Sequence, residues 1–353
     1  GSEMCIRDSK WVEADPQERM ESFRERGYVK MVDNMRDLCH AVNCDFDRWY
    51  SERSLYVKDT EGETAGTSAV DRAFEKLDKM GYLYTKDGAL WFRSTDLGDD
   101  KDRVLIKSDG EYTYFASDVA YHWDKFQRVD HVIDIWGADH HGHVARLKGA
   151  MDALGLDGQH RLDIVLMQLV RLMKDGQPYR MSKRSGRAVT LTDLLDDVPI
   201  DAARFFFNMR EPNATFDFDL DLAVQQSSEN PVYYVQYAHA RICSVLKLVM
   251  AEGLTEEDIH HADLGLLTTP EERELCRALG QLPDEIVAAA KYYDPARMTR
   301  YAMEVAALYH KFYQNCRVKC EDSAVCAARA ALCRATATVL ENTLAMLKIT
   351  APE

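Results

Sequence analysis

The chain has 353 residues, of which 46% are hydrophobic and 29% charged, a balance typical of globular proteins. This length accommodates about two to three domains, and no run of about 20 apolar residues predicts a membrane span. The formal net charge of −15 argues against a generic nucleic-acid-binding protein. Any RNA contact must therefore come from local basic patches, such as residues 174–187 and 311–319.

The first third of the chain predicts helices followed by short antiparallel strands. Residues 1–9 are polar and are interpreted as an artefactual leader outside the fold. A charge-rich helical pattern follows up to about residue 50, and a second helix is predicted over 68–80. Two Asp-Gly pairs then predict β-hairpins over 83–92 and 104–115.

A different pattern starts near residue 111. Two β-branched runs, 132–136 and 164–172, flank a predicted helix at 144–154. Strand, helix and strand in this order predict a βαβ unit of a parallel sheet, whose ligands bind beyond the carboxyl ends of the strands. The loops 137–143 and 174–186 follow those ends and are therefore the candidate binding loops.

The remainder of the chain predicts helices only. Thr192 is a candidate N-cap, and another helix is expected over 200–209. A boundary is expected at 227–231. Beyond it, amphipathic segments predict an all-α bundle, with helices at 232–251, 270–292, 295–318 and 323–347.

The loop after residue 179 carries the strongest chemical signal. Arg180, Lys183 and Arg184 are closely spaced cations followed by a flexible Ser-Gly pair. Such a loop suits a polyphosphate that gains charge during reaction, where one contact is typically worth about 2.7–4 kcal/mol in the transition state. The alternative is a solvated basic turn. Because the loop lies just beyond a predicted parallel strand, the functional interpretation is favoured over a solvated basic turn.

This loop resembles the KMSKS signature of class I aminoacyl-tRNA synthetases, with Arg180 in place of the first lysine. The resemblance implies that Lys183, with Ser182 and Arg180, stabilises the leaving pyrophosphate of ATP. It also implies that the backbone near Met181 lies close to adenine. Magnesium is expected to accompany ATP as part of the substrate complex, and no tightly bound cofactor is expected.

The segment 136–143 contains three histidines and an aspartate, and it admits three interpretations. A metal site is disfavoured because His140 and His141 are adjacent and would point to opposite faces of a strand; no metal ligands are predicted. The second interpretation is a cluster of histidines that only stabilises the fold. The favoured one is the strand end of a class I synthetase, where Gly137 lets the nucleotide approach and Asp139 or His140 contacts ribose or substrate.

Tyr114 and Asp118 lie four residues apart, so they share one face if the segment is helical. A guanidinium group offers five donors in a plane and suits a carboxylate beside an aromatic or acceptor group. The pair resembles the arginine-recognising tyrosine and aspartate of arginyl-tRNA synthetases, and His140 is expected on the substrate side. The alternative is an ordinary helix start capped by Ser117 or Asp118.

The helical half resembles the same family. Residues 201–207, 216–221 and 229–241 are similar to the passage that leads into its helical anticodon-binding domain, so the resemblance runs from about residue 48 to 353. Aromatic and basic residues gather between positions 310 and 319 and suit stacking on unpaired bases. Taken alone, this stripe is more typical of a helix that packs in a core. The candidate tRNA contacts are Arg241, Phe312, Tyr313, Arg317 and Lys319.

The expected fold class is therefore α/β, with a partial Rossmann-like class I synthetase fold, a small α+β insertion and an all-α bundle. The expected division is a leader (1–9), a helical and hairpin insertion of the catalytic domain (10–110), the second half of the Rossmann-like fold (111–190), a stem-contact-type connector (191–230) and a DALR-type anticodon-binding domain (231–353). The nine cysteines lack zinc-site spacing, which favours buried thiols in a reducing cytoplasm over a metal site or redox pair.

The function that this resemblance implies is the ATP-dependent ligation of L-arginine to its tRNA through arginyl-adenylate, by a protein expected to be monomeric and without membrane contact. The family's HxGH element is expected near the start of the nucleotide fold. The letters H-x-G-H occur in these 353 residues only at 140–143, after the insertion, so they are not interpreted as that element. We therefore expect a C-terminal fragment that is inactive alone. Two alternatives stay open: a class I synthetase for another amino acid, and a non-catalytic tRNA-binding or scaffolding module.

Overall fold

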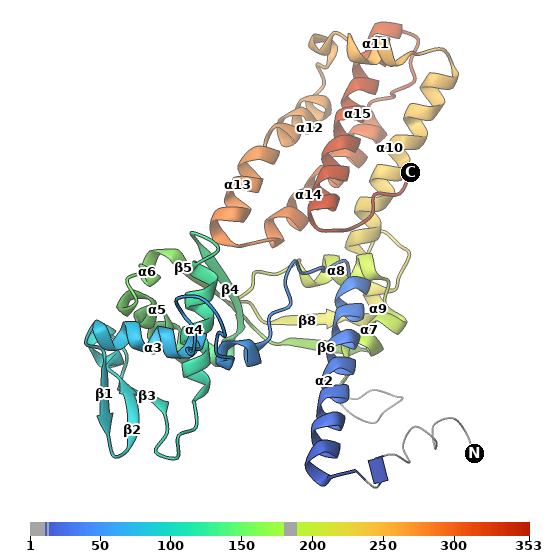
Figure 1. The fold of residues 1–353 in the computed structure, drawn as a ribbon. Helices are drawn as coiled ribbons and strands as arrows, with labels where there is room; N and C mark the ends of the chain where they lie inside the picture. Colours follow the sequence, from blue (N-terminus) through green and yellow to red (C-terminus); the bar gives the residue numbers. More distant parts are fainter. Residues whose placement is uncertain (1–10, 13, 180–188) are drawn as a thin grey trace.

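The structure, a computed structural model, describes residues 11–12, 14–179 and 189–353. A mixed α/β region lies below an elongated helical bundle, and helix α2 lies at the lower right of the view (Figure 1). The longer helices are α2 (Pro16–Ala41), α3 (Ala69–Lys79), α4 (Tyr114–Phe126), α5 (Val144–Ala153), α8 (Ile200–Phe207), α10 (Pro231–Ala251), α12 (Pro270–Gly280), α13 (Leu282–Tyr292), α14 (Ala296–Asn315) and α15 (Ser323–Met346).

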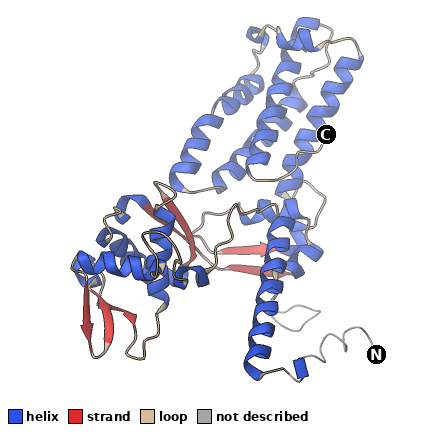
Figure 2. Ribbon diagram, viewed as in Figure 1, coloured by secondary structure: helices blue, strands red, loops and turns tan. Residues whose placement is uncertain are grey.

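Short helical turns connect these elements. They are η1 (Glu52–Tyr56), η2 (Ser94–Leu97), η3 (Ala138–His143), α6 (Gly158–Arg161), α7 (Leu191–Asp197), α9 (Leu220–Ala223), α11 (Glu256–His260) and η4 (Leu264–Leu266). The strands are β1 (Leu83–Lys86), β2 (Ala89–Phe92), β3 (Arg103–Ile106), β4 (Val132–Gly137), β5 (Leu162–Met167), β6 (Val170–Lys174), β7 (Gln177–Pro178) and β8 (Phe216–Asp219). Figure 2 shows these strands confined to the lower half of the molecule.

The first predicted hairpin is confirmed, whereas the second is wrong in its return strand. β1 and β2 pair antiparallel across Asp87-Gly88, and β3 adds to β2. Beyond Gly110 only a single bridge, Ile106 to Tyr112, forms before α4 begins at Tyr114. The helix prevails because Phe115, Val119 and Phe126 recur at helical spacing and are buried against the α/β core.

The predicted βαβ unit is confirmed over its first strand and helix. β4 and β5 pair in parallel from Val132↔Leu162 to Gly137↔Met167, with α5 between them in the chain. The predicted single strand 164–172 is wrong: it divides into β5 and β6, which belong to different sheets. The break lies at Gln168, whose backbone N–H donates to the carbonyl of Pro212, and β6 then pairs in parallel with β8.

Two helix ends also differ from prediction. Thr190, rather than Thr192, caps α7, because its hydroxyl accepts from the N–H of Asp193 in a capping box. The predicted helix 270–292 is divided into α12 and α13 at Gln281. Pro283, in the first turn of α13, lacks the N–H that would continue the hydrogen-bond ladder of α12.

The bundle is built around α10, α14 and α15, with α12 packed on α14. Among the described helices, α15 is long and apolar enough by composition to cross a membrane. Here it is a core helix, since Leu340 and Leu344 are fully buried and it packs against α10 and α14. Tyr309 and Phe312 of α14 are also fully buried in this core.

Candidate active site

A cavity of about 280 Å³ opens beside the first turns of α4. Tyr114 and Asp118 both line it, as their spacing predicts, and neither Ser117 nor Asp118 is a cap because α4 begins at Tyr114. The other lining side chains are Tyr50, Glu52, Leu55, Ser117 and Tyr121. The cavity therefore combines two carboxylates with three tyrosines.

The two carboxylates come from different elements. Glu52 opens η1, whereas Asp118 lies one turn into α4 and is half-buried. Burial raises the pKa of Asp118, and the nearby His122 and His143 offset only part of this effect. A cationic ligand would remove that penalty by pairing with the carboxylate.

A buried polar network on α4 and β4 contacts residues that line the cavity. The Nδ1 atom of His122 donates to the carbonyl oxygen of Asp118 at 2.7 Å, and its Nε2 contacts Asp134 on β4. Lys125 donates to the other oxygen of Asp134 at 2.6 Å and lies 4.5 Å from the ring centroid of Tyr121. Burial opposes the ionisation of Asp134, but His122 and Lys125 outweigh it and lower its pKa.

Tyr121 in turn packs on Tyr50, with ring centroids 4.5 Å apart. The network thus touches Asp118 directly and reaches the aromatic wall through Lys125. Because the side chains of His122 and Asp134 are only 4% and 6% exposed, the network is shielded from solvent. It joins the C-terminal half of α4 to β4, and the hydrogen bond from His122 to the carbonyl of Asp118 connects it to the turn that lines the cavity.

The carboxyl end of β4 carries the second predicted constellation. Gly137 ends the strand, and η3 follows with Asp139 and the three histidines. A methyl group at Gly137 would lie 2.5 Å from a carboxylate oxygen of Asp139, so a larger residue would displace that side chain. His140 is exposed and lies 3.7 Å from Asp139, and its ring contacts those of Trp136 and His143.

His140 does not line the cavity beside α4. The η3 histidine that acts on Asp118 is His143, whose own pKa is lowered by burial and by Arg146. Within the described residues, no group of three His, Cys, Asp or Glu side chains is arranged to hold a metal ion. The substrate contact predicted for His140 and the ribose contact predicted for Asp139 stay predictions.

The candidate RNA contacts of the bundle divide into two groups. The guanidinium of Arg241 lies 5.0 Å from the ring centroid of Tyr313 and 4.5 Å from that of Tyr237, which sequence analysis did not select. Phe312 is fully buried in the bundle core, so the prediction of an RNA contact for it is wrong. Its ring falls on the inner face of α14 because residues 309 and 312 are three apart.

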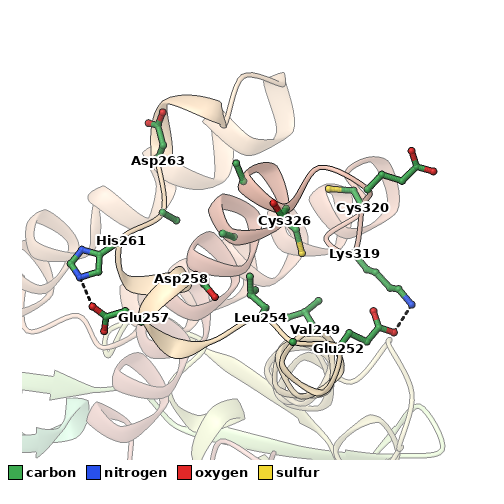
Figure 3. A pocket seen from close by; sticks show the side chains of 16 residues that line it. Val249, Glu252, Leu254, Glu257, Asp258, His261, Asp263, Lys319, Cys320 and Cys326 are labelled. Atoms are coloured by element: carbon green, nitrogen blue, oxygen red, sulfur yellow. Dashed lines mark hydrogen bonds and ion pairs between the residues drawn. The ribbon is translucent and has the colours of Figure 1, made fainter.

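Arg317 and Lys319 are exposed beyond α14. Lys319 is paired with Glu252 on α10 at 2.5 Å. The same region borders a cavity of about 630 Å³ at the distal end of the bundle (Figure 3). Its lining is acidic, with Glu257, Asp258 and Asp263 among the side chains, so it does not suit a phosphate backbone.

Comparisons with known proteins bear on both halves of the chain. The family model described as "tRNA synthetases class I (R), catalytic domain" matches residues 19–243, and the "DALR anticodon binding domain" model matches residues 235–353. The chain belongs to the arginyl-tRNA synthetase family. It is 50% identical over 350 residues to the arginine–tRNA ligase of Caldanaerobacter subterraneus subsp. tengcongensis, and that match covers 99% of this chain and 60% of the relative.

Solved structures agree with this family. A Campylobacter jejuni protein assigned as an arginyl-tRNA synthetase superposes with a TM-score of 0.83 at 31% identity, covering 95% of this chain and 70% of that one. The arginyl-tRNA synthetase of Thermus thermophilus gives 0.74 at 20% identity, covering 98% and 68%, which supports the fold. The chain thus spans about 60% of the length of the curated arginine–tRNA ligases it matches.

Of the seven residues that line the cavity beside α4, the sequence predicted two as ligand contacts, Tyr114 and Asp118. Glu52, Tyr50 and Tyr121 were missed, because the first two lie more than 60 residues before Asp118 and no local pattern marks them. Tyr121 could have been found, since it is one turn beyond Asp118 on the same helix. The predicted pyrophosphate-binding residues Arg180, Met181, Ser182 and Lys183 lie outside the described residues.

Proposed function

We propose that this chain contributes the arginine pocket, the nucleotide edge and the tRNA-binding bundle of an enzyme that ligates L-arginine to its tRNA through arginyl-adenylate. The observation that carries the proposal is the cavity beside α4. A guanidinium group is planar and always charged, so it pairs with the Asp118 carboxylate while Glu52 offers a second acceptor. Tyr114 and Tyr121 supply aromatic faces beside it.

The chemistry asked of the protein is positioning and charge stabilisation. L-arginine is held by its side chain beside α4, ATP with its Mg²⁺ lies at the carboxyl ends of β4 and β5 near Gly137 and Asp139, and Lys183 with Ser182 and Arg180 contacts the leaving pyrophosphate. The backbone near Met181 is proposed to contact adenine. The carboxylate of arginine attacks the α-phosphorus of ATP and displaces pyrophosphate. A hydroxyl of the terminal ribose of tRNA then attacks the carbonyl carbon of the adenylate, loses its proton and displaces AMP.

The bundle is proposed to bind tRNA, with Arg241 and Tyr313 as base-stacking residues and Arg317 as a phosphate contact. Lys319 is left out of this proposal, because it is paired with Glu252 beside the acidic cavity. Arg241 lies beside the exposed rings of Tyr237 and Tyr313, and unpaired bases stack on aromatic rings and guanidinium groups of this kind. We further propose a cytoplasmic, monomeric protein without membrane contact. The described cysteines are all free, which suits a reducing compartment.

The 353-residue chain alone is expected to give no arginine-dependent ATP–pyrophosphate exchange, even with cognate tRNA present. The reason is that no HxGH run precedes the insertion, where it would bind the ATP phosphates opposite Lys183, and the run at 140–143 follows the insertion. Ile133 and Ile135 on β4 are also 49% and 70% exposed, so this face of the strand lacks a covering layer. We propose that a segment outside these residues supplies both. Exchange above the enzyme-free background would contradict this expectation.

Arginine binding is expected to weaken as the pH falls. The pKa of Asp118 is raised above its ordinary value of 3.8, and only its ionised form pairs with the guanidinium. Affinity is therefore full well above that raised pKa and declines as pH falls through it, with one proton taken up by the free protein. Titrations of L-arginine between pH 4 and 7 measure this. A pH-independent affinity would show that Asp118 does not contact the ligand.

A further inference from the structure

A single polar bridge joins the helical bundle (residues 231–353) to the α/β body (residues 50–178) in the part of the chain that the structure describes. The hydroxyl of Tyr293 donates to Oδ2 of Asp163 at 2.6 Å. The Nε2 atom of His131 lies 2.8 Å from the same oxygen and 3.5 Å from the hydroxyl. The hydrogen bond to Tyr293 is the main cause that lowers the pKa of Asp163, so the carboxylate is the acceptor.

Tyr293 adopts a backbone conformation that favours glycine. It is the C-cap of α13 with φ 52°, in the left-handed region. A side chain at this position costs conformational free energy that glycine would avoid. Strain of this kind persists where the side chain has a function, and here the side chain reaches across to the other domain.

The corner that carries Tyr293 is held rigidly. Asp294 is buried, accepts from the N–H of Ala296 at the start of α14, and binds Arg300 at 2.9 Å. Arg297 of α14 makes a two-pronged ion pair with Glu285 of α13, at 2.9 and 3.0 Å. The phenol of Tyr293 is therefore presented from a fixed platform and needs little ordering to reach Asp163.

On the α/β side, the bridge meets the amino-terminal ends of two parallel strands. Asp163 is the second residue of β5, and His131 directly precedes β4. The same two strands end at Gly137 and Met167, at the edge where the nucleotide is proposed to bind. A cavity of about 610 Å³ lies beside the bridge and is lined by residues 164–166 of β5 and by Tyr292, Asp294 and Arg297 of the corner. The hydroxyl of Tyr293 is thus the polar contact between the bundle and this strand pair in the described residues.

We propose that Tyr293 is a positioning residue that fixes the bundle against the strand pair β4–β5, and that tRNA held by the bundle orders the nucleotide edge through this bridge. The second half of this statement rests on the proposed function of the bundle. The first half does not. Parallel strands are stiff elements, so constraint at Asp163 and His131 is transmitted to Gly137 and Met167 at their other ends.

The first test is hydrogen–deuterium exchange on the 353-residue chain without tRNA. Tyr293→Phe removes only the hydroxyl, and the matched control is Tyr292→Phe, whose side chain is 63% exposed. Tyr293→Phe is expected to raise amide exchange in 132–137 and 162–167 at least about fivefold, whereas the control leaves it unchanged. Combining Asp163→Asn with Tyr293→Phe is expected to raise exchange by less than the product of the two single effects, because both changes remove the same hydrogen bond. Equal exchange in both single variants overturns the bridge.

The second test adds a transcript of cognate tRNA. Binding is expected to slow amide exchange in 132–137 and 162–167 in the wild type and the Tyr292→Phe control. Tyr293→Phe is expected to lose this protection while its Kd for tRNA changes less than twofold. Protection that persists in Tyr293→Phe overturns the coupling. If tRNA does not bind the wild type at all, the proposed function of the bundle fails, and the tRNA-free comparison still decides whether the bridge exists.

Discussion

Replacing Asp118 by Asn is expected to weaken the binding of L-arginine about a hundredfold, which corresponds to about 2.7 kcal/mol. The carboxylate already bears the cost of burial, as its raised pKa shows. Removing one partner of a desolvated, hydrogen-bonded charge pair typically costs about 2–5 kcal/mol, because the remaining charge stays in the site unpaired. Isothermal titration with L-arginine measures the change.

The matched control for Asp118 is Asp124→Asn on the same helix. Asp124 pairs with Arg128 on the outer side of α4 at 3.1 Å, and exposed pairs of this type contribute about 0–1 kcal/mol to stability. Arginine affinity should therefore stay within about twofold of the wild type. If Asp118→Asn binds arginine as well as Asp124→Asn does, the cavity beside α4 is not the guanidinium site.

The largest stability effect is expected at Asp134. Asp134→Asn leaves Lys125 and His122 without their charged partner beneath the cavity, and breaking a buried pair in this way typically costs about 3–5 kcal/mol. Because the pKa of Asp134 is lowered on folding, its contribution is present above its unfolded pKa, near 4, and is lost as pH falls through the folded pKa. Urea denaturation of the α/β region at pH 7 measures the loss.

Asp139→Asn makes the same chemical change at a side chain that is 82% exposed, so it should alter stability by less than about 0.5 kcal/mol. The comparison also separates stability from function. Asp134→Asn should lower arginine affinity in the folded protein as well, because His122 would lose the partner that orients it toward Asp118. If the Asp134→Asn protein has the same free energy of unfolding as the wild type, the charge of Asp134 does not stabilise the fold.

The regular elements could be predicted from sequence because their periods are local. The helix 68–80 and the hairpin at Asp87-Gly88 depend on spacing and turn chemistry alone, and both formed as predicted. The strand 164–172 was mispredicted because a mostly apolar run, interrupted only by Gln168 and Arg171, does not reveal which sheet each part of it joins. That choice depends on the backbone hydrogen bond between Gln168 and Pro212, 44 residues apart.

The site followed the same division. Tyr114 and Asp118 share one helix, so their spacing placed them together before the fold was known. Glu52 and Tyr50 reach the same cavity only through the packing of η1 against α3 and α4. Phe312 was misassigned because composition marks a residue as aromatic but does not say whether its ring faces the core or the solvent.

The central claim is that the cavity lined by Tyr50, Glu52, Tyr114, Asp118 and Tyr121 recognises a guanidinium cation. Titration of the 353-residue chain with L-arginine and with L-citrulline tests it most directly, since citrulline keeps the length and planarity of the side chain but carries no charge. We expect saturable binding of arginine and at least about tenfold weaker binding of citrulline. This ratio corresponds to a loss of about 1.4 kcal/mol or more in binding free energy. Equal affinity for the two ligands, or binding of neither, would contradict it.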